Sequence, residues 1–236
     1  MWLSYGLLAF ILIAGVAYST AARKLTVIAA LTGAAVAVLV FAGNGFTGLA
    51  MMTTFFILGS AATSVQSNTK KDLNADQKGG RTSAQVLANA GTAALCGILI
   101  LVLPVVHAHV LQLMMAASFA SATADTLSSE LGTVYGKRFF NIITLKPDVR
   151  GLDGVISLEG TLIGVAGSVV IAIVCTIGLG WTINIIWIVV AGTLGNLTDS
   201  ILGAVFERNG IIGNNTVNFL NTLIAALFML LFYFVL

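Results

Sequence analysis

Two carboxylates close an apolar run of this sequence, in the stretch ADTLSSELG at positions 124–132. Counted at about 1.5 Å per residue from His107, Asp125 lies roughly 27 Å along a helix, near the inner edge of a bilayer. Ionisable residues at such a depth are costly and are functional by default. Glu130 lies about 140° around the helix from Asp125 if the helix continues, and it can turn inward if the helix ends at Gly132. The structural alternative is an interfacial cap or an ion pair with a basic side chain.

A carboxylate on another run, Asp199 in the stretch GNLTDSILGAVFE, reaches the same depth when it is counted from Trp181. Two carboxylates on different helices at one depth can share a metal ion. Mg²⁺ is held by one or two carboxylates together with substrate phosphates. The sequence therefore predicts a magnesium site at Asp125 and Asp199, with Glu130 as a further candidate ligand.

Amide and guanidinium side chains form two more polar stripes. In GRTSAQVLANAG, the residues Arg81, Gln85 and Asn89 are four apart and share one helix face. In GNNTVNFLN, Asn214 and Asn218 repeat this spacing, and Asn221 lies on the same face. A guanidinium backed by amide donors suits phosphate oxygens, whereas hydrogen bonds that hold neighbouring helices together are the structural alternative.

A glycine-rich stretch, VRGLDGVISLEGTLIG at positions 149–164, precedes another apolar run. It carries Asp153, Ser157, Glu159 and Thr161 among its glycines. Glycine allows close approach of the backbone to a ligand, and free N–H groups at the start of a helix favour phosphate. The stretch is a candidate phosphate loop, and a flexible connector is an equally good interpretation.

Membrane-spanning helices must position these side chains. The chain has 236 residues, of which 58% are hydrophobic and 8% are charged, whereas soluble domains have about a quarter charged. We expect an all-α integral membrane protein, a single domain over residues 1–236. Apolar runs of spanning length predict about eight helices, at 3–20, 25–43, 46–64, 83–103, 106–127, 160–178, 182–204 and 216–236.

Charge sets the orientation of this bundle. With the N-terminus outside, all 11 Lys and Arg residues fall in cytoplasmic segments, as the positive-inside rule requires. The nine Asp and Glu residues lie in or beside the same segments, although that rule makes no demand on acids. A signal peptide is the alternative for the first run, but no positive residue precedes it. The charged, functional face is therefore expected to be cytoplasmic.

Five motifs together resemble the transmembrane-protein-nineteen-like family, which includes a plant phytyl-phosphate kinase. GRTSAQVLANAG, ADTLSSELG, RGLDGVISLEGTLIG, LTDSILGAVFE and NNTVNFLNT occur in that family's order and spacing. GLDGVISLEGT is especially similar to the plastid kinase branch. The chain departs from the family pattern at Ala90, Leu152 and Ile156, where the family more often has Gly, Thr and Val.

The resemblance implies a membrane kinase that converts an isoprenyl monophosphate to the diphosphate with a nucleoside triphosphate, CTP being favoured over ATP. The known use is phytol salvage for tocopherol or quinone synthesis. Taken with the residue patterns, it assigns Mg²⁺ to Asp125, Glu130 and Asp199 and phosphate neutralisation to Arg81 and two lysines. These lysines are Lys70 and Lys78. The phosphates would be oriented by the amides of Gln85, Asn89, Asn214 and Asn218. The donor pocket would be lined by Asp153, Ser157, Glu159 and Thr161.

Two other functions remain as alternatives. A small-molecule transporter needs polar or broken helices at mid-depth, and polar side chains here stop at the inner edge. A non-catalytic membrane assembly protein would not need the acids, although a layer of ion pairs could supply a use for them. Expected partners are the bilayer, the isoprenyl phosphate, the nucleotide and, as one more candidate, a second copy in a homodimer. Nothing predicts nucleic-acid binding, and we expect a plasma (inner) membrane because no transit peptide precedes the first run.

Overall fold

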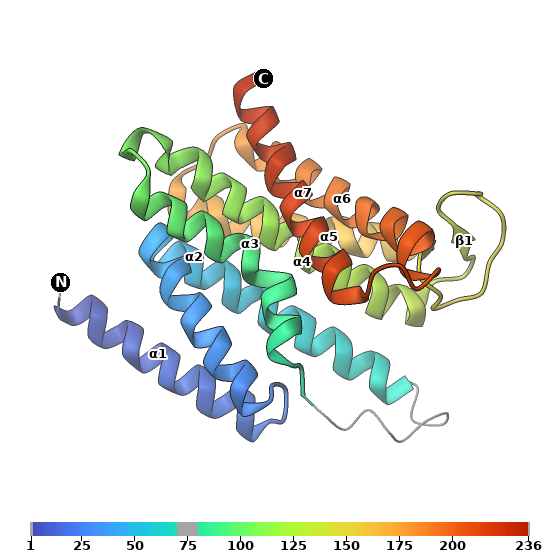
Figure 1. Ribbon diagram of the computed structural model, residues 1–236, viewed down its shortest axis with the longest axis horizontal. Helices are drawn as coiled ribbons and strands as arrows, with labels where there is room; N and C mark the ends of the chain where they lie inside the picture. Colours follow the sequence, from blue (N-terminus) through green and yellow to red (C-terminus); the bar gives the residue numbers. More distant parts are fainter. Residues whose placement is uncertain (1, 70–79, 236) are drawn as a thin grey trace.

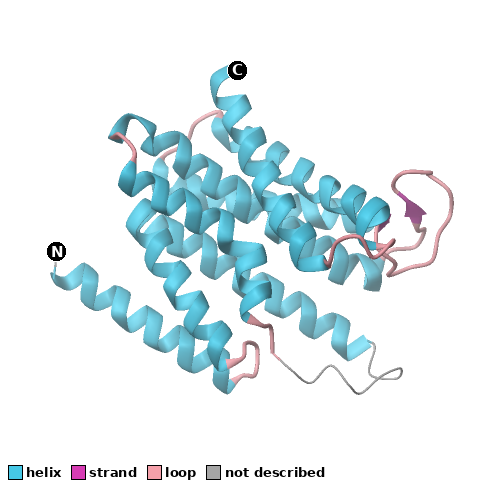
Figure 2. Cartoon of the chain, viewed as in Figure 1, coloured by secondary structure: helices cyan, strands magenta, loops and turns pink. Residues whose placement is uncertain are grey.

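Helices make up nearly all of the computed structural model, which describes residues 2–69 and 80–235 without the side chains of Trp2, Asn68 and Thr69 (Figure 2). The long helices are α1 Trp2–Ala21, α2 Val27–Thr69, α3 Ser83–Val102, α4 Ala108–Tyr135, α5 Leu158–Leu179, α6 Asn184–Leu202 and α7 Asn214–Val235 (Figure 1). The short elements are η1 Val105–His107, the π-helical turn η2 Gly203–Glu207, and the strands β1 Phe140–Asn141 and β2 Val155–Ile156. The prediction of an all-α membrane protein is confirmed.

The number of predicted spans is not confirmed, because the described residues hold 7 helices that are long and apolar enough to cross a membrane. The difference lies in α2, whose 43 residues would measure about 64 Å, twice the hydrocarbon thickness. Its helical geometry breaks at Asn44 and at Gly45, where φ is 54° and ψ is −146°. The chain reverses there, so that two arms run side by side in opposite directions (Figure 1).

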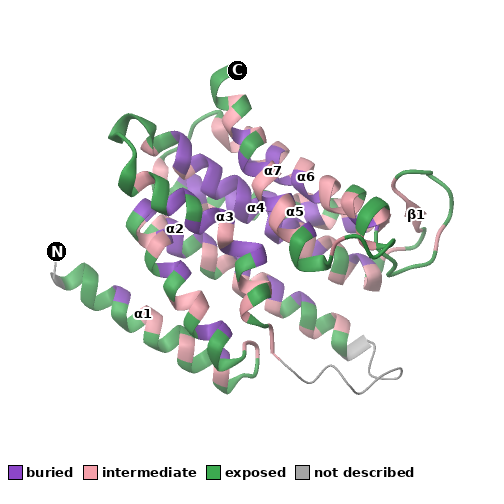
Figure 3. Ribbon diagram, in the orientation of Figure 1, coloured by how far each residue is buried: buried purple, intermediate pink, exposed green. Residues whose placement is uncertain are grey.

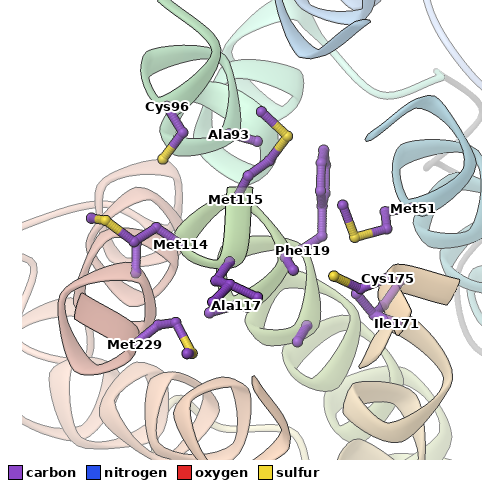
Figure 4. Close-up of a cluster of buried hydrophobic side chains, with 14 of the residues drawn as sticks. Met51, Ala93, Cys96, Met114, Met115, Ala117, Phe119, Ile171, Cys175 and Met229 are labelled. Atoms are coloured by element: carbon purple, nitrogen blue, oxygen red, sulfur yellow. The ribbon is translucent and has the colours of Figure 1, made fainter. Parts of the chain in front are cut away.

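Helix α4 forms the centre of the bundle and packs against α2, α3, α5, α6 and α7. Its buried positions are mostly alanine, serine and methionine (Figure 3). A core cluster of side chains from several helices surrounds the N-terminal half of α4, including Met51, Met115, Phe119, Ile171 and Met229 (Figure 4). Because lipid is as apolar as leucine, such close packing of small side chains is what holds membrane helices together.

Glycines of α5 and α6 allow both helices to approach α4 closely. A Cβ on Gly160 of α5 would lie 3.1 Å from the Cα of Gly132, and one on Gly164 would lie 3.0 Å from the carbonyl oxygen of Ala124. On an adjoining surface of α4, a Cβ on Gly192 of α6 would lie 2.7 Å from the Cβ of Ala120 and 2.7 Å from the Ser168 hydroxyl of α5. These two seams fix the rotation and height of α5 and α6 relative to α4.

Candidate functional site

The carboxyl groups of Asp125 and Asp199 lie within hydrogen-bonding reach of each other. The seam between α4 and α6 explains why. Gly195 of α6 packs against the hydroxyl of Ser121 on α4, and four residues further along each helix stand Asp199 and Asp125. Because the two helices run in the same direction (Figure 1), one turn brings both carboxylates to the same height.

Asn221 of α7, the third helix at this site, holds the aspartate pair in place. Its Nδ2 donates to Oδ1 of Asp199 at 2.7 Å, and its Oδ1 accepts from the Ser121 hydroxyl at 3.0 Å. The residue is fully buried. This arrangement fixes the orientation of the Asp199 carboxylate and links the three helices that meet there.

The pair fits a hard divalent cation. Two adjacent carboxylates repel each other unless a proton or a cation lies between them. Within the described part of the chain, neither aspartate forms an ion pair with Lys or Arg, and no third acid, His or Cys joins them in a metal-binding group. Mg²⁺ commonly uses one or two carboxylates, with phosphate and water as the other ligands.

Glu130 belongs to a separate polar cluster. Helix α4 continues past Gly132 to Tyr135, so Glu130 stays on the helix and its Oε1 accepts from the Thr63 hydroxyl at 3.3 Å. Arg81 Nη2 donates to the same hydroxyl at 3.3 Å, and the guanidinium lies 6.0 Å from the ring centre of Phe55. Burial lowers the pKa of Arg81, and the charge of Glu130 raises it in part. The aspartate pair and this cluster occupy different sides of α4, and metal binding by Glu130 stays a prediction.

A cavity of about 210 Å³ opens beside Asp199. It is smaller than the roughly 300–1,000 Å³ typical of small-molecule pockets, so it suits a phosphate group better than a whole nucleotide. Its lining brings together five of the predicted site residues: Asp153, Ser157, Thr161, Asp199 and Asn214. No Lys or Arg of the described residues lines it, and an anion entering it would need a cation brought from elsewhere.

The glycine-rich stretch forms one wall of this cavity. Ser157 caps the start of α5, where its hydroxyl accepts from the Gly160 N–H at 3.1 Å. Gly154 has φ +74° and packs against Ala204 of η2, where a side chain could not fit. Glu159 is not part of the cavity lining; its Oε2 accepts from the backbone N–H of Lys137 at 3.4 Å.

The amide stripes are only partly available to a ligand. Gln85 forms a capping box with Thr82, in which its Oε1 accepts from the Thr82 N–H at 2.8 Å. Asn89 donates to the carbonyl of Gln85 at 2.9 Å, and its buried Oδ1 has no hydrogen-bond partner among the described residues. Asn218 donates to Asn214 at 3.5 Å and likewise has a buried, unpartnered Oδ1. Lys70 and Lys78 lie outside the described residues.

Three residues of the site were not among the predicted ones. Glu207 lines the cavity and lies within hydrogen-bonding reach of Asn214. Ser128 donates to Asn196 Oδ1 at 3.0 Å, and both line the cavity. Asn221, by contrast, was predicted from its spacing to share the helix face of Asn214 and Asn218.

An exposed ion pair ties the two loops over the cavity together. The guanidinium of Arg208 lies 2.5 Å from Asp148 Oδ2. Arg208 lowers the pKa of Asp148 to about 2. Because β1 pairs antiparallel with β2 through Phe140 and Ile156, this ion pair positions the whole connection between α4 and α5 against η2.

Comparison with known proteins gives a consistent set of relatives. The family described as "Integral membrane protein DUF92" matches residues 9–226. An uncharacterized membrane protein of Synechocystis sp. is 34% identical over 193 residues, which are 80% of this chain and 75% of that protein. An uncharacterized membrane protein of Methanocaldococcus jannaschii is 34% identical over 189 residues, with 80% and 77% covered.

A plant protein is similar as well. "Protein VTE6, chloroplastic" of Arabidopsis thaliana is 32% identical over 185 residues, which are 75% of this chain and 56% of that protein. This similarity agrees with the resemblance to a plastid branch that the motifs indicate. No solved structure matches the chain significantly.

Proposed function

The chain belongs to the DUF92 family of integral membrane proteins, and on that premise we propose that it is a membrane kinase for isoprenyl monophosphates. Its reaction transfers the terminal phosphoryl group of a nucleoside triphosphate to the lipid phosphate and yields an isoprenyl diphosphate. The observation that carries this proposal is the contact of Asp125 with Asp199 beside a phosphate-sized, acid-lined cavity.

The chemistry asks little of the protein beyond positioning and neutralisation of charge. A phosphate oxygen of the isoprenyl monophosphate attacks the γ-phosphorus of the nucleotide and forms the new P–O bond. The bond between the γ-phosphorus and the bridging oxygen breaks, and the nucleoside diphosphate leaves. The attacking oxygen is already anionic at neutral pH, so no general base is required.

Each part of the site has a task in this reaction. Asp125 and Asp199 would hold Mg²⁺, which neutralises the phosphate charge when it is bound. Ser157, Thr161 and Asn214 offer hydroxyl and amide groups to phosphate oxygens at the cavity wall. Asn221 keeps the Asp199 carboxylate in place through its 2.7 Å hydrogen bond. We infer that the positive charge that the cavity wall lacks comes from the lysines of the 65–82 segment and from Arg81, although Arg81 lies with Glu130 and Thr63 and does not line the cavity itself.

The substrate and the compartment follow from the chain's chemistry and its resemblance. Phytyl, geranylgeranyl and farnesyl phosphates are the proposed acceptors, and CTP is the favoured donor. The positive-inside rule supports a cytoplasmic position for the cavity. A role in phytol salvage toward tocopherol or quinones is consistent with similarity to a chloroplast protein.

The transporter alternative has less support from the fold. A transporter needs polar groups along a route across the membrane, and the interior of the bundle outside the site is dominated by the apolar cluster around Phe119 (Figure 4). An assembly protein would have no use for two adjacent carboxylates that repel each other.

One experiment separates these functions. The purified chain in lipid nanodiscs receives geranylgeranyl, phytyl or farnesyl phosphate with Mg²⁺ and either CTP or ATP, and the lipid products are identified by mass spectrometry. We expect the diphosphate to form with Mg²⁺ and not with EDTA. Absence of every diphosphate with folded protein would refute the kinase, and uptake of an isoprenyl phosphate into proteoliposomes without conversion would support a transporter instead.

A further inference from the structure

An apolar groove runs between α3 and α7, apart from the acid-lined cavity. Its volume is about 500 Å³. The floor consists of small residues of α3, namely Ala88, Gly91 and Ala94, and Phe219 of α7 closes one side. The two helices are neighbours along this stretch (Figure 1), where Thr92 and Thr222 are joined by a 2.8 Å hydrogen bond.

The groove faces lipid rather than the protein interior. Its rim residues Leu87, Leu95 and Ile98 are 48%, 47% and 39% exposed, so a chain can enter sideways from the bilayer. The groove is open above its floor because the residues of the floor are small. A Cβ on Gly91 would already lie 3.3 Å from the Phe219 ring, and larger side chains would fill the space.

The groove ends next to the phosphate site. At its start on α7 it is lined by Asn215 and Thr216, and the residue before them, Asn214, lines the cavity beside Asp199. From Ala84 the groove follows α3 to Ile98, a distance of about 21 Å at 1.5 Å per residue. One leaflet of a bilayer is roughly 15 Å thick, so the groove can hold a hydrocarbon chain of lipid length.

We propose that this groove binds the isoprenoid tail of the substrate and sets the longest tail that the protein accepts. The inference rests on the proposed function for the identity of the tail. The polar end of the groove at α7 then directs the lipid phosphate toward the cavity. The far end of the groove, near Ala94 and Ile98, limits the length of the tail that fits. An ordinary bilayer lipid or a second copy of the chain are the other occupants that a test must distinguish.

The first measurement is binding, which does not depend on turnover. Geranylgeranyl phosphate with a photoreactive diazirine at the tail end is irradiated with the full-length chain in phosphatidylcholine nanodiscs, and labelled peptides are mapped. We expect labelling around Leu95, Ile98 and Phe219 that unlabelled geranylgeranyl phosphate removes by competition. Labelling that resists this competition would mean that a bilayer lipid covers the groove, and labelling that falls as the chain dimerises would assign the groove to a second copy. Either result would overturn the inference.

The second measurement is chain-length preference. Ala94→Phe fills the floor, and Ile98→Trp enlarges an exposed side chain at the deep end without entering the core. We expect kcat/KM for geranylgeranyl phosphate to fall at least about 10-fold, with less than about 2-fold change for geranyl phosphate. Ala166→Phe, at an exposed position of α5, is the matched control and should leave the preference unchanged.

The outcomes separate the two proposals. Competable labelling in the groove without any diphosphate product would refute the kinase and keep the lipid-binding groove. Turnover with unchanged chain-length preference in both groove variants would refute the groove and keep the kinase.

Discussion

Two carboxyl groups in contact carry most of the functional argument. Asp125 and Asp199 meet because α4 and α6 pack through Gly195 and Ser121 one turn earlier. Like charges so close to each other cost free energy in the folded protein unless a proton or cation lies between them. Such a site lowers the stability of the metal-free protein and provides ligands for a cation. Both effects can be measured as changes in Tm.

Replacement of either aspartate by asparagine should remove this repulsion. We expect Asp125→Asn and Asp199→Asn to keep or raise the Tm without Mg²⁺, since the amide has the same shape without the charge. Wild-type protein at ten times the Kd for Mg²⁺ should gain about 3–6 °C in Tm, and both variants should gain almost nothing. Differential scanning fluorimetry measures this, and equal Mg²⁺ shifts in all three proteins would show that the metal binds elsewhere.

Asn221 should act on the metal through Asp199. Asn221→Ala removes the 2.7 Å hydrogen bond to the carboxylate, and loss of such a supporting contact typically costs about 10–100-fold in metal affinity. The Mg²⁺ concentration for half-maximal activity should rise by that factor. Thr222→Val is the control, because Thr222 is equally buried but bonds Thr92; a similar Mg²⁺ shift in this variant would assign Asn221 a merely structural role.

The depth of these side chains could be predicted from the sequence, but their directions could not. Counting residues along two apolar runs was enough to place Asp125 and Asp199 at one level. The alternatives for Glu130 depended on whether α4 ends at Gly132. For Gln85 the alternatives were phosphate binding and a hydrogen bond to a neighbouring helix, and the structure instead shows a capping box with Thr82. Such choices depend on helix rotation and on local hydrogen bonds, which periodicity alone does not contain.

Glycine seams between helices decide whether the aspartates meet at all. A Cβ on Gly195 would overlap Ser121 and lie 2.8 Å from the Cβ of Ala225. Gly195→Ala should therefore push α6 away from α4, cost about 1–3 kcal/mol of stability and reduce activity more than the Tm loss explains. Gly33→Ala in α2, where nothing lies within 4 Å, should be neutral. A fully active Gly195→Ala protein would argue against this seam.

The Asp148–Arg208 ion pair should hold the connection between α4 and α5 in place. Because the pKa of Asp148 is lowered to about 2, the pair contributes above the ordinary aspartate pKa of about 4 and is lost as pH falls toward 2. Arg208→Gln at neutral pH should mimic that acid state. Hydrogen exchange should then become faster across 137–157 with little change in Tm, while unchanged exchange would show that the strands alone hold the loop.

Hydropathy predicted where the helices lie more reliably than how they connect. Two separate helices were predicted at 25–43 and 46–64. In the structure they form the two arms of α2, which meet at Asn44 and Gly45, where glycine adopts the backbone angles that reverse the chain. The small residues of α4 gave no strong amphipathic signal, since this helix is covered by others on most of its surface.

The assembled bundle concentrates its chemistry at one end. The connection between α4 and α5 lies where α4 and α6 end and α7 begins (Figure 1). Asp125 stands in the second half of α4 and Asp199 in the last turn of α6, and the cavity is lined by residues of these helices and by Asn214 at the start of α7. We expect Lys137→Cys to react with an impermeant maleimide only from the cytoplasmic side. Val106→Cys at the other end, 78% exposed, should react only from outside, and the natural Cys96 and Cys175 are buried. Reversed labelling of the two sites would invert the proposed orientation.

Transfer of the nucleotide's terminal phosphoryl group to a lipid phosphate tests the central claim most directly. Nucleotide labelled at the γ-phosphate is incubated with geranylgeranyl phosphate, Mg²⁺ and either wild-type protein or Asp199→Asn in nanodiscs. We expect label in geranylgeranyl diphosphate with wild-type protein and at least about 100-fold less with the variant. Wild-type protein that leaves all label in nucleotide or free phosphate, or a variant that transfers label at the wild-type rate, would contradict it.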